Sequence, residues 1–189
     1  HRQMCIRDRD GIAEIVMALS KVFRFAVKGE HIVTVEEEVD YIKEYAKIID
    51  YRFMGKIEVN IRMEEEVREK RVIKLLLQPL VENAVFHGLE QRVEDGAVEV
   101  NIGRKDERHL MFKVTDNGCG IEEEKLKEIC DALGSKESKN GIGMSNIYQR
   151  LKLFYGEAVE FDVQSKRNQG TVITIVVPDD VWEDKEKNV

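Results

Sequence analysis

The sequence predicts an α/β fold in which two amphipathic helices precede an alternation of strands and helices. Apolar residues recur at three- and four-residue spacing over residues 10–28 and again over 34–53, which is the helical period. Beyond the second helix the period changes to two, because Ile57, Val59 and Ile61 alternate with polar residues. A helical hairpin followed by a mixed α/β part is the architecture that these two patterns favour.

The composition is that of a globular chain with a substantial core. Of its 189 residues, 42% are apolar and 35% are charged, and only two are proline, which argues against extensive disorder. The net charge of -7 and the absence of a basic face argue against a nucleic-acid partner. The three cysteines are widely spaced, which favours a reducing compartment, and no apolar run approaches the ~20 residues that span a bilayer.

The ends of the two helices are marked by local signals. Gly29 is suited to end the first helix, and Thr34 followed by Glu37 is a capping-box pattern that begins the second. The first nine residues, 1–9, do not continue the apolar stripe, so we expect them to be irregular or foreign to the natural protein. The two helices form either a hairpin or a dimer surface.

The remaining elements are indicated by the apolar pattern and by glycine and proline positions. The run from 72 to 88 has a helical pattern in which Pro79 either kinks the helix or begins a new segment. Further along the chain we expect strands at 97–103 and 109–115, a helix at 122–132, a mobile loop at 133–142, a helix at 143–155, and strands at 158–165 and 171–177.

The first motif is PLVENAVFHG, within the helical run. Helical spacing places Glu82, Asn83 and His87 on one face, together with Pro79 and Phe86. An amide oxygen is a suitable ligand for Mg²⁺, which binds few protein groups and retains waters and phosphate oxygens. The alternative is that Asn83 only bonds a neighbouring backbone group.

The second motif is VTDNGCGI. A strand ends in Asp116, and Gly118 and Gly120 come after it, which lets the backbone turn tightly and lets a ligand approach it. A carboxylate at a strand end accepts hydrogen bonds and can take the exocyclic amine proton of adenine. A simple turn explains the same residues.

The third motif is NGIGMSNIYQRL. Gly141 and Gly143 open a helix that begins near Met144. Free N–H groups and the helix dipole make such a position an anion site. A helix cap without a ligand explains one such loop equally well.

The order of the motifs is more specific than any one of them. A helical Asn, a strand with Asp-Gly-x-Gly, a flexible loop, a Gly-x-Gly helix and a strand pair around Gly170 and Thr171 resemble the nucleotide-binding domain shared by histidine kinases, type II topoisomerases, heat-shock chaperones and mismatch-repair ATPases. Within that group, LLLQPLVENAVFHGL, GIGMSNIYQRLKLFYG and VTVEEEVDYIKEYAKIIDYRF resemble the LytS/YesM-type sensor histidine kinases. The resemblance runs from about residue 10 to 178.

The resemblance implies a Bergerat-type ATP-binding fold, an α+β two-layer sandwich whose mixed sheet is covered by helices on one face. It divides the chain into a helical dimerisation or linker segment at 10–55, a catalytic domain at 56–180 and a tail at 181–189. It implies ATP and Mg²⁺ as ligands, with Asn83 binding the metal. The other implied nucleotide contacts are Asp116 with Thr171 at adenine, Gly118 and Gly120 around that pocket, His87 beside the nucleotide, and Gly141, Gly143 and Met144 at the phosphates, under a lid at 132–142.

Two departures from the family pattern affect the chemistry. Many relatives have Lys where this chain has Phe86, so we expect weaker ATP binding, with phosphate charge met by Mg²⁺, the helix N-terminus and cations such as Lys136, Lys139 or Arg150. Hydrolytic relatives have a general-base Glu where this chain has Pro79, which favours phosphoryl transfer to histidine over hydrolysis. Glu82 is the one nearby carboxylate that could act catalytically, although it points differently along the helix.

The acceptor-histidine pattern of the family, similar to PHFLFN, is not present in this sequence, and His1 lacks its flanking residues. The expected function is therefore transfer of the ATP γ-phosphoryl group to the histidine-bearing region of a full-length kinase, without autophosphorylation. Further expected partners are a response regulator receiver domain and a second copy in a homodimer, and the expected location is the cytoplasmic portion of a membrane-bound bacterial sensor kinase. The alternatives are a non-catalytic nucleotide-binding or dimerisation module and an ATPase of the same fold.

Overall fold

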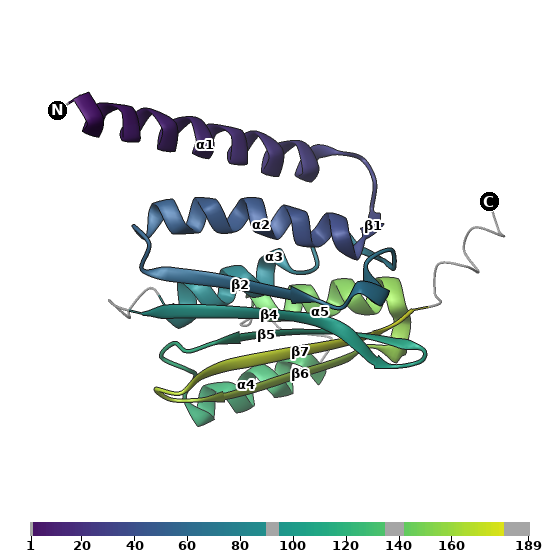
Figure 1. The fold of residues 1–189 in the computed structure, drawn as a ribbon. Coiled ribbons are helices and arrows are strands. Elements are labelled where there is room, and N and C mark those ends of the chain that lie inside the picture. Colours follow the sequence, from purple (N-terminus) through teal and green to yellow (C-terminus); the bar gives the residue numbers. More distant parts are fainter. Residues whose placement is uncertain (1, 90–94, 135–141, 180–189) are drawn as a thin grey trace.

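A five-stranded mixed sheet organises the structure, a computed structural model that describes residues 2–89, 95–134 and 142–179 (Figure 1). Its strand order is β2-β4-β5-β7-β6; β2 and β4 are parallel and the other neighbours are antiparallel. The strands expected from the sequence are all present within a few residues of their predicted bounds. They are β2 (Ile57–Met63), β4 (Gly96–Asp106), β5 (His109–Asp116), β6 (Glu160–Lys166) and β7 (Gly170–Pro178).

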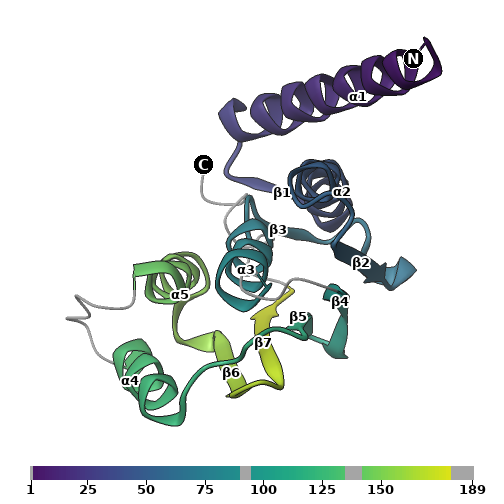
Figure 2. The same cartoon turned by 90° about the vertical axis from the view of Figure 1, so that its left-hand side faces the viewer.

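Helices lie on one side of this sheet (Figure 2). They are α3 (Gln78–Glu82) with the π-helix η2 (Asn83–Leu89) that continues it, α4 (Glu123–Gly134) and α5 (Ile142–Tyr155); single 3₁₀ turns occur at Glu65–Val67 and Gly156–Ala158. Along β5, Leu110, Phe112 and Val114 are buried and alternate with half-buried residues, so one face of the strand lines the core. The predicted two-layer α+β sandwich is confirmed.

The N-terminal helices α1 (Arg2–Val27) and α2 (Val35–Arg52) form the expected antiparallel hairpin (Figure 1). The capping box is confirmed, because the Glu37 N–H donates to Thr34 Oγ1 at 3.1 Å and the Thr34 N–H donates to Glu37 Oε2 at 2.9 Å. A short strand β1 (Ile32–Thr34), which the sequence did not suggest, pairs antiparallel with β3 (Arg71–Ile73).

The expectation that residues 1–9 are irregular is wrong for residues 2–9, which belong to α1. The segment contains Arg, Gln, Met and Ile, which favour a helix, and neither Gly nor Pro occurs before Gly11. An apolar stripe indicates where a helix packs, and its loss does not end the helix. The expected tail at 181–189 lies outside the described residues, as does most of the loop expected at 133–142.

The predicted helix over 72–88 is also wrong in its first third. Residues up to Ile73 pair with β1, and a loop comes next in which Leu75 has a φ of 58°, before α3 begins at Gln78. Pro79 lies in the first turn of α3, so it begins a new segment rather than kinking a longer helix. The apolar run before Pro79 is mostly buried, although part of it is strand and part is loop. Its apolar residues therefore matched the helical spacing without the segment being a helix.

One hydrophobic core joins the hairpin to the sheet. Val39 and Ile42 of α2 belong to the same buried cluster as Leu80, Phe112 and Leu151. The boundary expected at 55/56 therefore does not separate two cores. By contrast, α1 packs mainly on α2, with the Phe25 and Tyr41 ring centroids 4.7 Å apart.

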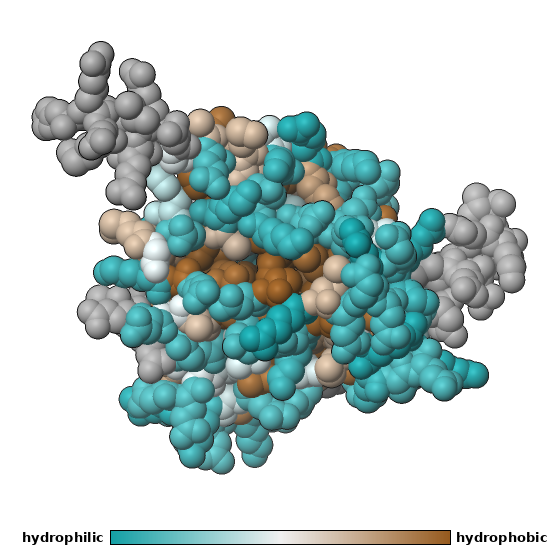
Figure 3. Space-filling model, in the orientation of Figure 1, coloured by the Kyte–Doolittle hydropathy of each residue, from teal (hydrophilic) through white to brown (hydrophobic). Residues whose placement is uncertain are grey.

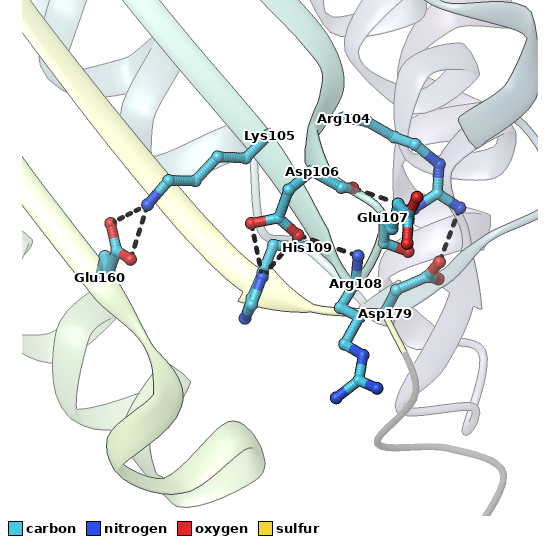
Figure 4. A network of polar contacts seen from close by, with 8 residues as sticks. All are labelled: Arg104, Lys105, Asp106, Glu107, Arg108, His109, Glu160 and Asp179. Atoms are coloured by element: carbon cyan, nitrogen blue, oxygen red, sulfur yellow. Dashed lines mark hydrogen bonds and ion pairs between the residues drawn. The ribbon is translucent and has the colours of Figure 1, made fainter.

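The outer surface carries a group of ion pairs at the β4–β5 hairpin and a hydrophobic hollow. At the β4–β5 hairpin, Arg104 bonds Asp179 at 2.8 Å and Lys105 pairs with Glu160 at 2.6 Å, which ties the hairpin to the end of β7 and to β6 (Figure 4). On the face drawn in Figure 1, hydrophobic side chains gather in a hollow across the middle (Figure 3). No helix among the described residues is both long and apolar enough to cross a bilayer.

Candidate functional site

Asn83 and His87 are carried by the helix that runs under the sheet. Asn83 ends α3, and the chain continues as a π-helix through Leu89. Single π-helical turns are rare and occur often at functional sites, because the wider turn redirects side chains. Here Asn83, Ala84, His87 and Gly88 all line one pocket.

Asp116 lies at the end of β5, opposite Thr171 of β7 in the strand register. Its side chain is buried, and Oδ1 accepts the Gly118 N–H at 2.8 Å. Burial raises the pKa of the Asp116 carboxyl, and hydrogen bonds from the backbone of Gly118 and Thr171 act in the opposite direction. A buried acceptor at this place is suited to a ligand that donates a hydrogen bond.

Two glycines allow the loop after Asp116 to lie directly on neighbouring backbone. A Cβ on Gly118 would lie 2.1 Å from the carbonyl oxygen of Gly88, so only hydrogen fits there. Gly120 has a φ of 66°, and a Cβ on it would lie 2.0 Å from the carbonyl oxygen of Lys166. The loop is therefore fixed between η2 and the β6–β7 turn.

The three motifs converge on one pocket. Its lining includes Asn83 and His87 from the first motif, Asp116 and Gly120 from the second, and Met144 from the third, together with Ala84, Gly88, Ile121, Thr171 and Ile173. Gly118 lies behind this wall rather than in it. Gly143 is in the first turn of α5, and Gly141 lies outside the described residues.

The pocket is nearly closed in this structure. Its volume is about 40 Å³, close to the space of one water molecule, whereas ligand sites usually measure ~300–1,000 Å³. Larger hollows lie elsewhere, one of about 450 Å³ between α1 and α2 and one of about 280 Å³ between α3 and α5. Size alone would point to those hollows, but it is the small pocket that unites the three motifs.

Asn83 has an unused hydrogen-bonding group. Its Nδ2 is buried and has no hydrogen-bond partner in the part of the chain that the structure describes. A buried amide without a partner is unfavourable, so it indicates a site that a ligand or water completes. No cluster of three or more His, Cys, Asp or Glu side chains suited to a metal occurs among the described residues.

Comparison with known proteins gives the family. Residues 67–181 match the model of the histidine kinase-, DNA gyrase B- and HSP90-like ATPases, and this match covers more than half of the chain. The chain belongs to this ATPase family. Residues 1–57 match a histidine kinase model, a segment that includes the first nine residues. Membership implies that this histidine kinase-like ATPase domain binds ATP.

The curated relatives are sensor proteins. The chain is 32% identical over 185 residues to the sensor protein LytS of Bacillus cereus, which covers 97% of this chain and 31% of LytS. It is 31% identical over 167 residues to the sensor protein kinase HptS of Staphylococcus aureus, which covers 87% of this chain and 32% of HptS. The chain thus spans about a third of the length of these relatives.

Solved structures agree with the fold of the ATPase domain. The histidine kinase domain of a blue-light activated histidine kinase from Erythrobacter litoralis superposes with a TM-score of 0.60 at 22% identity, over 94% of this chain and 79% of that one. Histidine kinase ThkA in complex with the response regulator protein TrrA gives a TM-score of 0.55 at 16% identity, over 90% and 49% of the two chains.

Two candidate residues of the ATPase domain face α2 instead of the pocket. Glu82 Oε1 accepts the Tyr45 hydroxyl at 3.0 Å and Gln78 Nε2 at 2.7 Å. The Phe86 ring lies 6.2 Å from that of Phe53 and 4.7 Å below the Arg52 guanidinium. Helical spacing had grouped these side chains with Asn83 and His87. The wider π-helical turn separates Phe86 from them, whereas Glu82 precedes that turn and lies about 100° around the helix from Asn83.

Of the cations considered for phosphate binding, Arg150 does not line this pocket. It donates to the carbonyl oxygen of Leu75 at 3.1 Å and to that of Lys74. Lys136 and Lys139 lie outside the described residues.

Sequence reasoning missed Ser165, which supports the Thr171 side of the pocket. Its hydroxyl accepts the Ile121 N–H at 2.8 Å, donates to the Gly170 carbonyl at 3.0 Å and lies 2.9 Å from Thr171 Oγ1. The signal was present in the strand alternation, because Ser165 falls on the same face as the buried Val163. A small polar residue on an inward face indicates a polar partner.

Proposed function

We propose that this chain is the catalytic portion of a sensor histidine kinase that transfers the γ-phosphoryl group of ATP to a histidine on a partner chain. The observation that carries the proposal is the convergence of Asn83, Asp116 and Met144, from three separated motifs, on one pocket of a histidine kinase-like ATPase domain, where Thr171 of β7 joins them. The acceptor histidine, the metal and the individual residue roles belong to the proposal.

The adenine base is assigned to the Asp116 side of the pocket. Its buried carboxyl accepts hydrogen bonds, as the exocyclic amine of adenine requires, and Thr171 lies beside it in the adjacent strand. Gly118 and Gly120 allow the loop to pack closely enough to keep water out. His87 lines the mouth of the pocket with an exposed ring that can lie beside the base.

Asn83 is assigned to Mg²⁺. The side chain lines the pocket, and its unpaired Nδ2 is a donor that a phosphate oxygen of the nucleotide would complete. Its carbonyl oxygen would be the ligand, since Mg²⁺ takes oxygen donors and few of them from protein. The chemistry that Mg²⁺ supplies when bound is neutralisation of phosphate charge.

The phosphates are assigned to the N-terminal end of α5. Gly141 and Gly143 precede and begin this helix, and Met144 lines the pocket beside it. Backbone N–H groups and the helix dipole at this end favour an anion. Because the side chains of Arg150 and Phe86 bond elsewhere, we expect backbone groups, the metal and cations such as Lys136 or Lys139 to meet the phosphate charge.

The acceptor is proposed to be a histidine rather than water. Pro79 stands one turn before Asn83 and cannot accept a proton, and Glu82 is bonded to Tyr45 outside the pocket. A neutral imidazole has a free lone pair at pH 7 and needs no base. Because the acceptor pattern is absent from this sequence, we expect transfer to the histidine-bearing region of a longer kinase chain, and no autophosphorylation.

The proposed partners are those that this role requires. A receiver domain of a response regulator would take the phosphoryl group from histidine, and the relatives named as sensor proteins support a place in the cytoplasmic portion of a membrane-bound bacterial sensor. A homodimer through α1 is supported by its exposed apolar residues, which recur at helical spacing. They are Ile12, Val16, Leu19, Phe23 and Val27.

Label transfer tests the proposal. The chain is mixed with Mg²⁺, γ-labelled ATP and the longer histidine-bearing fragment of its parent, and acid-labile label on that fragment is the expected result. Binding of ATP without transfer would leave only a nucleotide-binding module. Release of inorganic phosphate without the acceptor would instead favour an ATPase.

Replacement of Asn83 tests the metal assignment. Asn83→Ala should abolish the Mg²⁺-dependent part of ATP binding, because it removes the one proposed protein ligand. Titration of ATP with Mg²⁺ and with a chelator measures that part. The same Mg²⁺ dependence in variant and wild type would exclude Asn83 as the ligand.

A further inference from the structure

The four residues before α3 form a junction between the hairpin and the nucleotide site. Lys74 to Leu77 connect β3 to α3, and Leu75 adopts a φ of 58°, in the left-handed region that L-residues with large side chains rarely occupy. Such a conformation persists only where the surroundings hold it. Figure 2 shows why it can be held from two sides, because α3 lies between α2 and α5.

From one side the segment is held by Glu38 of α2. This side chain is fully buried, and its carboxylate accepts the N–H groups of three successive residues: Leu75, Leu76 at 3.0 Å and Leu77 at 3.3 Å. Three backbone donors on one carboxylate fix both its orientation and theirs.

The burial of Glu38 is unfavourable by itself. Removal from water raises the pKa of Glu38 to about 7, against the lowering effect of the three N–H groups and of the Arg150 charge. A carboxylate of this kind is costly to bury and does not stabilise the core as an apolar residue would. Its effect is on the conformation of the segment that it bonds.

From the other side the carbonyl groups of the segment are held. Arg150 of α5 donates to the carbonyl oxygens of Leu75 and Lys74. The Lys74 ammonium donates in turn to the carbonyl oxygen of Lys28 at 2.5 Å, at the end of α1. The junction therefore touches α1, α2 and α5.

The helix that leads to Asn83 begins directly after the junction. Leu77 is the last residue before α3, and Asn83 is six residues further on. Tyr41 of α2 bonds Gln78, and Tyr45 bonds Glu82, so α2 accompanies α3 along its whole length. Asp116, by contrast, is fixed on the sheet. The start of α3 therefore sets where Asn83 lies relative to Asp116.

We propose that Glu38 is a positioning residue of the nucleotide site: by fixing residues 75–77 it sets the place of Asn83, and so the Mg²⁺-dependent part of ATP binding. The inference rests on the proposed assignment of Asn83 to Mg²⁺ and of Asp116 to adenine. It also means that a shift of the hairpin would be transmitted through α2 to Asn83, the proposed metal ligand.

The test separates metal-dependent from metal-independent binding. Dissociation constants are measured for ATP with Mg²⁺ and for ADP with a chelator, in wild type, Glu38→Gln and Val39→Ala. Val39 is the matched control, because it is buried in the same helix and bonds no residue of the junction. Glu38→Gln should weaken Mg-ATP by about tenfold, the scale of a lost charge-assisted hydrogen bond, and ADP in chelator by less than about threefold.

Val39→Ala should lower the melting temperature and leave the ratio of the two constants unchanged. An equal loss for both ligands in Glu38→Gln, or a changed ratio in Val39→Ala, would overturn the inference in favour of a purely structural role. Should Glu38→Gln not fold, Glu38→Asp carries the same test, because it keeps the charge and withdraws it by one methylene.

Asn83→Ala in the same series keeps the two proposals apart. Loss of Mg²⁺ dependence in Asn83→Ala with retention in Glu38→Gln would overturn the role of Glu38 alone. Wild-type Mg²⁺ dependence in Asn83→Ala would overturn both, since Glu38 would then have no metal ligand to position.

Discussion

The buried carboxyl of Glu38 makes a prediction about stability and pH. Its pKa is raised from 4.5 to about 7, chiefly by burial. Between these two pH values the folded state binds the proton more tightly than the unfolded chain does. Ionisation of Glu38 therefore opposes folding, and its contribution to the free energy of unfolding falls as the pH rises through this window and is constant above it.

The size of the effect is set by the pKa difference. A shift from 4.5 to about 7 corresponds to about 3 kcal/mol of unfolding free energy, lost between about pH 4.5 and pH 8. Glutamine does not ionise, so the unfolding free energy of Glu38→Gln lacks this pH-dependent decrease. Variant and wild type also differ by a pH-independent cost, because an amide N–H would face the donors of Leu75 to Leu77.

Urea unfolding at several pH values measures the prediction. The difference in unfolding free energy, variant minus wild type, should rise by about 3 kcal/mol from pH 4.5 to pH 8. Asp116, whose pKa is raised, is common to both chains and cancels. Tyr41, whose pKa burial raises to about 12 with a contribution from Glu38, titrates above this window. A difference that stays constant with pH would refute the reasoning, and a falling one would show that the hydrogen bonds outweigh burial.

Three further substitutions test the site. Gly118→Ala should destabilise the fold by about 1–3 kcal/mol, because the new Cβ would lie 2.1 Å from the Gly88 carbonyl oxygen. The control is Gly11→Ala, whose Cβ meets no atom within 4 Å and which should stabilise α1 by about 1 kcal/mol. Thermal melting measures both variants, and equal effects would contradict the close packing at Gly118. Phe86→Lys should lose about 1–3 kcal/mol through lost contacts with Phe53 and Arg52 and should change ATP affinity by less than about twofold; a large gain in affinity would show that residue 86 reaches the phosphates after all. Asp116→Asn should weaken ATP by about tenfold and reduce the preference for ATP over GTP, because an amide can donate to the guanine oxygen; competition between the two nucleotides checks this, and an unchanged preference would remove adenine from Asp116.

The sequence predicted those parts of the fold in which local and tertiary preferences agree. β5 and β7 alternate or run apolar over their whole length, β4 does so up to Ile102, and the capping box at Thr34 specifies the start of α2 from four residues. Asn83, Asp116 and Thr171 do line one pocket, as the family resemblance of the ordered motifs implied; apolar and polar pattern alone did not bring these three residues together.

The segment from Arg71 to Leu77 could not be predicted from local pattern. Its conformation depends on residues far along the chain. Ile32 pairs with Ile73, Glu38 accepts hydrogen bonds from three N–H groups, and Arg150 donates to two carbonyl oxygens. The split between Asn83 and Glu82 was hidden for a similar reason. Consecutive residues lie about 100° apart around an α-helix, so Glu82 and Asn83 diverge even at the ordinary period, and the π-helix from Asn83 onward then turns Phe86 away from Asn83.

The small volume of the pocket has a consequence for how ligand affinities should be compared. A cavity of about 40 Å³ is too small for a purine, so a nucleotide requires the pocket to open, and we treat the open form as a minor state of the free chain. Each apparent dissociation constant equals the intrinsic one divided by the open fraction, and that fraction is the same for every nucleotide. Ratios between ligands are then independent of opening, while a substitution that favours the open form without touching Asn83 or Asp116 strengthens all of them by one common factor.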